Sequence, residues 1–168
     1  FIPIGSSNLA GFYGDFHGNG HSIKNLFINS SGGNVGLFWY SVGNISNVGL
    51  ENISISGKTN NIGGLAAGNY GEVSNSFSTG MVSGGNFVGG LVGHNYYGVI
   101  SNSYSTANVS GSWLIGGLIG WAEGAGDSVK NSFSTGDVSG NSYVGGLLSK
   151  GWESESIITN SYWLNSSR

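Results

Sequence analysis

The sequence predicts an all-β protein, a right-handed parallel β-helix with three faces and about five coils of roughly 27 residues each. Three observations lead to this prediction. Glycine is very abundant, with 33 copies in 168 residues. Short apolar segments recur at a nearly constant spacing, and no window places apolar residues at helical spacing. Repeats of this length are typical of solenoids and related arrays.

Three landmarks define the repeat. The first is a β-branched residue, one or two glycines and a leucine, at residues 35–38, 62–65, 88–91, 115–118 and 144–147. The second is an asparagine at 47, 75, 102, 131 and 160, and the third ends in Ser-Gly at 56–57, 83–84, 110–111 and 139–140. We therefore predict one domain over 1–168, with an irregular first coil and lead-in segment at 1–34 and tandem repeats at 35–168.

Each repeat contains three short extended runs separated by glycine or asparagine. A propeller blade needs four strands and about 40 residues or more, so a solenoid coil fits the repeat better. Parallel crossovers are nearly always right-handed, which predicts the hand. The glycine pairs are expected at corners where a Cβ would collide with neighbouring backbone.

In the run 73–79 and its equivalents, serines alternate with larger residues, as in Val73-Ser74-Asn75-Ser76-Phe77-Ser78-Thr79. If alternate residues face opposite sides of the strand, one class is core and the other is surface. We expect inner columns made of Phe77, Tyr104, Phe133, Tyr162 and of Val82, Val109, Val138. The serines would then form an outward hydroxyl grid, which makes ice binding conceivable, at Ser76, Ser78, Ser103, Ser105, Ser132 and Ser134. An asparagine ladder is expected at a bend, made of Asn75, Asn102, Asn131 and Asn160.

The charge content argues against several classes of function. Only 8% of residues are charged, the net charge is −3, and no run of like charges occurs. We therefore expect no nucleic-acid partner. No apolar stretch approaches the 18 or so residues needed to cross a bilayer, so we also expect no direct membrane insertion. The chain begins at Phe1 rather than methionine, so we expect a piece of a longer protein. Its richness in Ser, Asn, Gly and Thr with few charges suits an exported protein, and the absence of cysteine excludes disulfides and thiolate metal sites.

Two segments of the repeat resemble the repeat of a known protein family. Residues 88–93 (Val-Gly-Gly-Leu-Val-Gly) followed by 100–106 (Ile-Ser-Asn-Ser-Tyr-Ser-Thr) resemble the GLUG motif, and residues 3–23 resemble the segment that precedes such arrays. His17 stands where that family usually has Asp, and residues 35–38 have one glycine where later repeats have two. The resemblance implies an exposed, binding role, because the family occurs in adhesin-like surface proteins and in non-catalytic regions of immunoglobulin A peptidases.

Candidate catalytic and metal-binding residues are few. His17 and His21, with Asp15 nearby, flank a Gly-Asn-Gly turn and need not converge on an ion. His94 is expected to be a solvated loop residue. Four acidic residues in the last two repeats could pair to act on a polysaccharide, namely Glu123, Asp127, Glu153 and Glu155. No basic partner recurs with them, so we predict no enzyme, no cofactor and no metal.

Aromatic residues give the strongest indication of a contact surface. The loop after each Gly-Leu segment contains aromatic residues that we expect along one edge of the solenoid, namely Trp39, Tyr40, Tyr70, Tyr96, Tyr97, Trp121 and Trp152. A second outward column is expected at Phe87, Leu114 and Tyr143. Aromatics with a polar end suit wet interfaces and sugar ledges, whereas packing along the edge explains the same residues.

The predicted function is a non-enzymatic, extracellular structural or adhesive module that contacts a glycan or a protein on a cell surface. The alternative is a self-assembling subunit of a filament or sheath, because an open solenoid leaves unpaired backbone at its ends. Five Asn-x-Ser sequons are possible glycosylation sites, at Asn29, Asn44, Asn52, Asn108 and Asn165.

Overall fold

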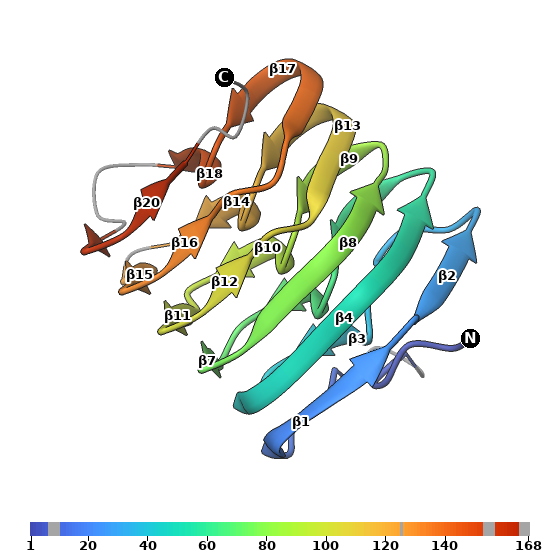
Figure 1. Ribbon diagram of the computed structural model, residues 1–168, viewed down its shortest axis with the longest axis vertical. Coiled ribbons are helices and arrows are strands. Elements are labelled where there is room, and N and C mark those ends of the chain that lie inside the picture. The colour runs from blue at the N-terminus through green and yellow to red at the C-terminus, as the bar shows by residue number, and fades with distance from the viewer. Residues whose placement is uncertain (7–10, 125, 153–156, 165–168) are drawn as a thin grey trace.

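The computed structural model describes residues 1–6, 11–124, 126–152 and 157–164, with only the backbone described at Trp152. These residues form 20 strands and no helix, and the strands stack in parallel, coil upon coil (Figure 1). Paired residues lie 27 positions apart at Val73 and Ile100 and 29 apart at Ile100 and Val129. The predicted parallel β-solenoid is confirmed.

The strands fall into two sheets. The 5-stranded sheet consists of β3 (Phe38–Ser41), β6 (Ala66–Asn69), β10 (Val92–Tyr96), β14 (Ile119–Glu123) and β18 (Leu148–Trp152). The 15-stranded sheet begins with β1 (Phe16–Lys24), β2 (Phe27–Ser30), β4 (Ile45–Gly57), β5 (Asn60–Gly63), β7 (Glu72–Ser74), β8 (Phe77–Ser83), β9 (Asn86–Gly89) and β11 (Val99–Ser101). It continues with β12 (Tyr104–Ser105), β13 (Asn108–Gly116), β15 (Ser128–Lys130), β16 (Phe133–Ser134), β17 (Val138–Gly145), β19 (Ile157–Thr159) and β20 (Tyr162–Trp163).

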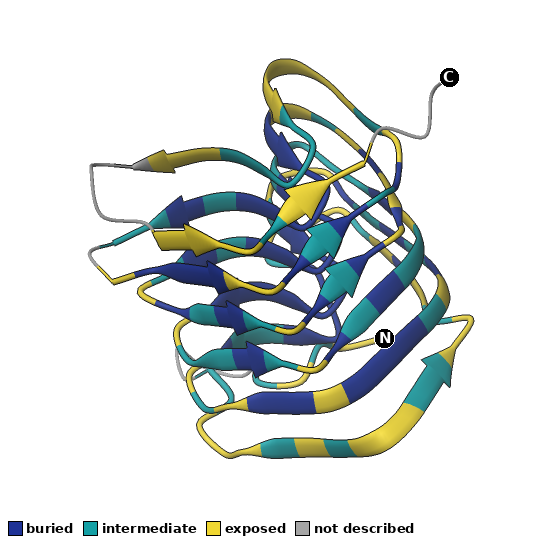
Figure 2. Ribbon diagram, turned by 60° about the vertical axis from the view of Figure 1, so that its left-hand side comes forward, coloured by how far each residue is buried: buried dark blue, intermediate teal, exposed yellow. Residues whose placement is uncertain are grey.

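The core runs along the axis as columns of aliphatic side chains. Val82 and Val109 are at most 1% exposed, as predicted, and Ile62, Val88 and Ile115 form a second fully buried column. Figure 2 shows buried residues concentrated in the middle coils and exposed ones in the first and last. A Cβ at Gly116 would collide with the carbonyl oxygen of Ile119, which explains a glycine at this corner.

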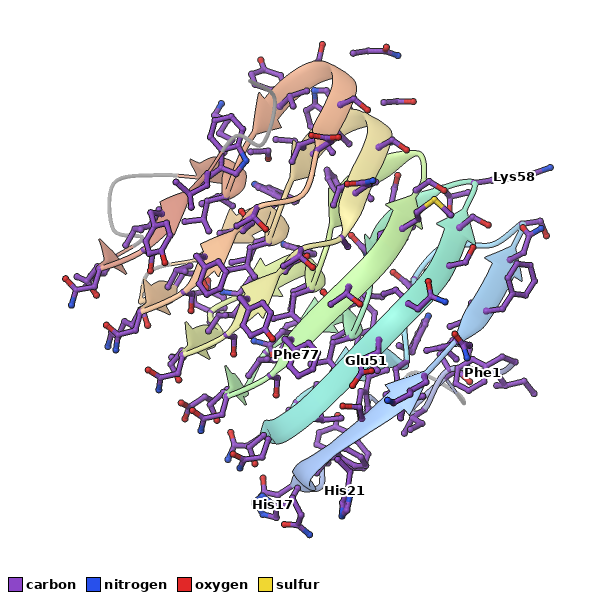
Figure 3. All side chains as sticks on the ribbon, in the orientation of Figure 1. Phe1, His17, His21, Glu51, Lys58 and Phe77 are labelled. Atoms are coloured by element: carbon purple, nitrogen blue, oxygen red, sulfur yellow. The ribbon has the colours of Figure 1, made fainter. Side chains whose placement is uncertain are left out.

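The prediction for the faces of run 73–79 is wrong. Ser76 and Ser78 are buried, with at most 2% exposure, and so are their equivalents in the next two coils. The hydroxyl grid therefore faces the interior, and ice binding through it is excluded. Phe77, Tyr104, Phe133 and Tyr162 instead form an outer column, which we call the aromatic stack; its rings lie 4.9–5.5 Å apart with interplanar angles of at most 7°. Figure 3 shows Phe77 on the ribbon face formed by β4 and β8.

The asparagine at the bend is the cause of this inversion. Asn75 and Asn102 have φ of 48° and 47°, in the left-handed region, so the inside-outside alternation shifts by one residue there. Val73 is therefore inside before the bend, and Ser76 is inside after it. The asparagine ladder itself is confirmed in two rungs, since Asn131 and Asn160 each donate to the preceding asparagine at 3.2 Å, but it is exposed rather than buried.

The buried serines bond from coil to coil. Ser103 Oγ donates to the carbonyl of Ser101 at 2.7 Å and accepts from the amide of Ser76 at 3.1 Å. Ser132 repeats the arrangement one coil later, accepting from the amide of Ser103 at 3.2 Å. This serine ladder supplies partners for backbone groups that the bend removes from the sheet.

Candidate functional site

A continuous row of rings follows one edge of the solenoid across successive coils. We call it the aromatic ridge, and its members are Trp39, Tyr40, Tyr70, Phe87, His94, Tyr96, Tyr97, Trp113, Trp121 and Tyr143.

The first part of the ridge contains the predicted tyrosines. Trp39 lies 4.9 Å from Tyr40, Tyr40 lies 5.7 Å from Tyr70, and Tyr70 lies 5.2 Å from Tyr96, measured between ring centroids. Tyr97 meets Tyr96 edge-on at 4.5 Å. These rings are tilted or perpendicular to one another, so their faces do not cover each other as in the aromatic stack.

The second part of the ridge joins the two predicted columns into one surface. His94 stacks on Trp121 at 4.6 Å with an interplanar angle of 9°, and Phe87 lies 4.8 Å from Trp121. Trp113 then connects Phe87, at 5.4 Å, to Tyr143, at 5.9 Å. Lys150 Nζ lies 5.3 Å from the centroid of the Tyr143 ring.

The strand register places these rings together. Tyr40, Gly68, His94 and Trp121 occupy equivalent positions of β3, β6, β10 and β14. A Cβ at Gly68 would collide with the Tyr40 ring, so this glycine lets Tyr40 lie flat against the coil above it. Burial and the neighbouring Tyr70 raise the pKa of Tyr40.

A buried polar ladder lies beneath the ridge loops. Asn69 Nδ2 donates to Asn95 Oδ1 at 2.8 Å, and Asn95 Nδ2 donates to Asp127 Oδ1 at 3.3 Å. Each asparagine also donates to a loop carbonyl, that of Gly71 at 3.0 Å and that of Gly98 at 2.8 Å. All three ladder side chains are at most 1% exposed. Burial raises the pKa of Asp127 to about 7. The ladder was missed because asparagine near glycine is expected in a solvated loop.

Several ridge aromatics have a backbone conformation that is unfavourable for bulky side chains. Phe87, Tyr97 and Tyr143 have φ of 53°, 56° and 52°. Asn34 and Asn61 occupy the positions equivalent to Phe87 and Tyr143 in the first coils, and asparagine tolerates positive φ better. Bulky residues at such positions cost about 1–3 kcal/mol each, and such strain clusters at functional sites.

Three predictions for this surface need correction or completion. Leu114 occupies the position equivalent to Phe87 and Tyr143, as predicted, but it is only 2% exposed, so it adds no accessible surface to the column. His94 is not solvated, since its side chain is only 12% exposed, lies 3.3 Å from Glu123, and burial lowers its pKa to about 4. Trp113 was missed because its equivalents, Asn86 and Ser142, are polar. The side chain of Trp152 lies outside the described residues.

The other candidate residues do not converge on a catalytic or metal site in the described part of the chain. His17 Nδ1 is 2.8 Å from Ser46 Oγ, and Figure 3 shows His17 and His21 near the lower end of β1. The described residues contain no group of three His, Cys, Asp or Glu side chains placed to hold a metal ion. Asp127 is 1% exposed in the polar ladder, and after burial the charge of nearby Glu123 adds to the rise in its pKa. Glu153 and Glu155 lie outside the described residues.

The sequon asparagines occupy exposed positions wherever the structure describes them. Asn29, Asn44 and Asn108 use their Oδ1 atoms as acceptors, from Ser56 Oγ and from the amides of Glu72 and Asp137. Asn52 instead donates its Nδ2 to Asn25 at 2.8 Å. A glycan at Asn52 would leave one N–H of this amide for the bond to Asn25, whereas the amide nitrogens of the other three make no such bond between coils among the described residues. Asn165 lies outside the described residues.

The fold and the ridge define a repeat protein of the parallel β-solenoid class with an aromatic surface. Residues 84–110 and 111–139 match the GLUG motif, so the chain contains GLUG-motif repeats in two adjacent coils, as the sequence indicated.

Two known proteins are similar to this chain. Halomucin of Haloquadratum walsbyi is 37% identical over 97 residues, which covers 55% of this chain and 1% of halomucin. The crystal structure of a candidate immunoglobulin A1 protease from Bacteroides ovatus superimposes with a TM-score of 0.76 and 29% identity, over 88% of this chain and 49% of that one. This chain therefore spans about half of the solved relative and a small part of halomucin. The described residues include no helix able to span a membrane.

Proposed function

We propose that this chain is a non-enzymatic, extracellular β-solenoid module that contacts a surface partner through the aromatic ridge. The observation that supports the proposal most is the ridge itself. Tyr70, Tyr97, Trp113 and Tyr143 are 39–54% exposed although they belong to one connected row of rings. Rings with polar ends that remain accessible are typical of protein and ligand contact surfaces.

The strain within the ridge supports the same role. If Phe87 and Tyr143 served only to cover the edge, asparagine would be cheaper at both positions, as in the first coils. The neutral His94 and the low charge of the whole chain favour a partner that is itself weakly charged. The exported location is inferred from the composition rich in Gly, Ser and Asn and from the GLUG repeats.

Bead attachment tests the proposal. Beads coated with the protein should be retained on at least one film among mucin, neutral polysaccharide and extracellular-matrix protein. The double variant W113A/Y143A should reduce retention several-fold, because it removes the two exposed rings at one end of the ridge. Y162A is the control, since Tyr162 has the same 53% exposure as Tyr143 but belongs to the aromatic stack. Equal retention of all three proteins would contradict the proposal.

A second candidate function is self-assembly into a filament. In the last coil, Val144 and Ile158 are 43% and 47% exposed, whereas their equivalents one coil earlier, Ile115 and Val129, are 0% and 3% exposed. A second copy, or a further coil of the same polypeptide, stacked on this face would cover them and pair the open strand edges. Sedimentation over a concentration series tests this function, and a strictly monomeric protein at high concentration would exclude it.

A further inference from the structure

A groove lies at the N-terminal end of the aromatic ridge. It has a volume of about 450 Å³ and is lined by Gly11, Tyr13, Trp39, Tyr40, Val42 and Tyr70. This volume is in the range of small-ligand sites. The six lining residues form a patch much too small for a stable protein interface.

The inner wall of the groove is rigid. Tyr40 Oη donates to Asn34 Oδ1 at 3.2 Å and accepts from Asn61 Nδ2 at 3.0 Å, and Asn61 also donates to Asn34 at 2.7 Å. The Tyr40 ring is also pressed against Gly68, where no side chain intervenes. A ring fixed in this way is a preorganised platform, so a ligand that packs on it need not order it first.

The rim supplies polar groups that are still available. Tyr13 is 67% exposed and Tyr70 is 42% exposed. In the part of the chain that the structure describes, the hydroxyls of Tyr13 and Tyr70 and the indole N–H of Trp39 form no hydrogen bond. The groove thus combines flat apolar surfaces with two hydroxyls that can donate or accept and one N–H that donates.

The lining contains no charged side chain, which selects among possible ligands. A nucleic acid or an acidic polysaccharide would bring anionic groups that find no cation here. A neutral sugar ring has apolar C–H faces and hydroxyl edges, which match the aromatic faces and polar rim of the groove. We propose that this groove binds a pyranose unit of an uncharged glycan, with the sugar placed between Tyr13 and Tyr70 and next to Tyr40. The inference rests on the proposed contact role of the ridge and gives that role a ligand class.

Calorimetric titration with neutral oligosaccharides tests the inference. The probes are oligomers of glucose, mannose, galactose and N-acetylglucosamine, with an oligogalacturonate as the acidic comparison. At least one neutral oligomer should bind, and the acidic one should bind at least tenfold more weakly. Y13A and Y70A should each raise Kd at least tenfold. Y13A should leave the melting temperature unchanged, because Tyr13 is 67% exposed, whereas Y70A should lower it slightly, because Tyr70 also packs on Tyr40 and Tyr96. The matched control is F27A, since Phe27 is 66% exposed on β2 and outside the groove.

The alternative outcomes are distinguishable. If no neutral oligomer binds, or if binding survives both Y13A and Y70A, the inference is wrong. If binding or bead retention is lost in W113A/Y143A but kept in Y13A and Y70A, the ridge still serves as a contact surface and only the groove assignment fails. If neither set of variants changes any binding, both proposals fail together.

Discussion

The aromatic ridge and the aromatic stack use the same residue types in opposite ways. Rings of the stack are parallel and about 5 Å apart, so each ring covers the face of the next. Apart from the parallel pair of His94 and Trp121, rings of the ridge meet at angles of 37–85°, and several keep exposed faces. The rings of the stack occupy the same position in successive coils and therefore lie one above another. The rings of the ridge come from several different positions of the coil. Aromatic residues repeated at one position thus form a structural column, whereas aromatic residues at different positions form a surface suited to binding.

The polar ladders beneath the two surfaces differ in the same sense. The serine ladder beneath the stack is neutral and repeats in consecutive coils. The ladder beneath the ridge ends on a buried carboxylate, Asp127, in a loop longer than those of the preceding coils. Of the two ladders, only the one beneath the ridge should therefore respond to pH.

The largest predicted effect is the pH response of D127N. The native pKa of Asp127, about 7, is above its ordinary value of 3.8, so the folded state binds the extra proton and the free energy of unfolding falls as pH rises from about 4 to 7. The slope from one proton is at most about 1.4 kcal/mol per pH unit. D127N should abolish this loss, and its stability advantage should grow through this window and then level off above pH 7.

His94 contributes the opposite slope. Its pKa is lowered from 6.5 to about 4, so its contribution to the free energy of unfolding is present above pH 6.5 and lost as pH falls toward 4. Urea unfolding of D127N should therefore show stability rising from pH 4 to 6.5. The control is E51Q. Glu51 pairs with Lys24 and its pKa is lowered, so removal of this carboxylate should reduce stability at neutral pH, the opposite of the effect of D127N. An unchanged profile for D127N would mean that Asp127 is already ionised in the fold at acidic pH.

Removal of a ring from the stack should affect stability but not binding. Y104A loses the contacts at 5.0 Å to Phe77 and at 4.9 Å to Phe133. The expected loss is about 2 kcal/mol, from two stacked pairs and a half-buried ring. Thermal melting measures it, and bead retention below the melting transition should match that of the unmodified protein. Reduced retention would show that the stack also contacts the partner.

The serine ladder and the asparagine bend can be separated by S103A and N102G. S103A leaves the amide of Ser76 without its buried acceptor and should cost about 1–2 kcal/mol. N102G should cost much less, because the residue is exposed and glycine adopts positive φ freely. Chemical denaturation of both variants measures the difference. A larger loss for N102G would show that the exposed side-chain ladder, rather than the backbone bend, stabilises this corner.

Y143N should produce the smallest change in stability and the most informative one. Asparagine suits a φ of 52° better than tyrosine, so the free energy of unfolding should rise by up to about 1 kcal/mol. Retention on the film that holds the unmodified protein should fall at the same time, since the ridge loses an exposed ring. Lower stability with full retention would assign Tyr143 to packing.

Repetition explains which features the sequence predicted correctly. Coil length, the corner glycines, the valine columns and the asparagine ladder all recur in register, so one repeat checks the next. The facing of Ser76 and Phe77 could not be read from alternation alone, because a single left-handed residue at Asn75 inverts it. The contribution of Trp113 and His94 to the ridge was missed because neither recurs, and their neighbours come from different strands.

Hydroxyl-radical footprinting of the protein, free and attached to the film that retains it, tests the central claim most directly. Tyr97, Tyr143 and Tyr162 are 54%, 53% and 53% exposed, so they should be oxidised at similar rates in the free protein. On attachment, oxidation of Tyr97 and Tyr143 should fall several-fold, while that of Tyr162 in the aromatic stack should not change. Protection of Tyr162 with continued oxidation of both ridge tyrosines would contradict the assignment of the ridge as the contact surface.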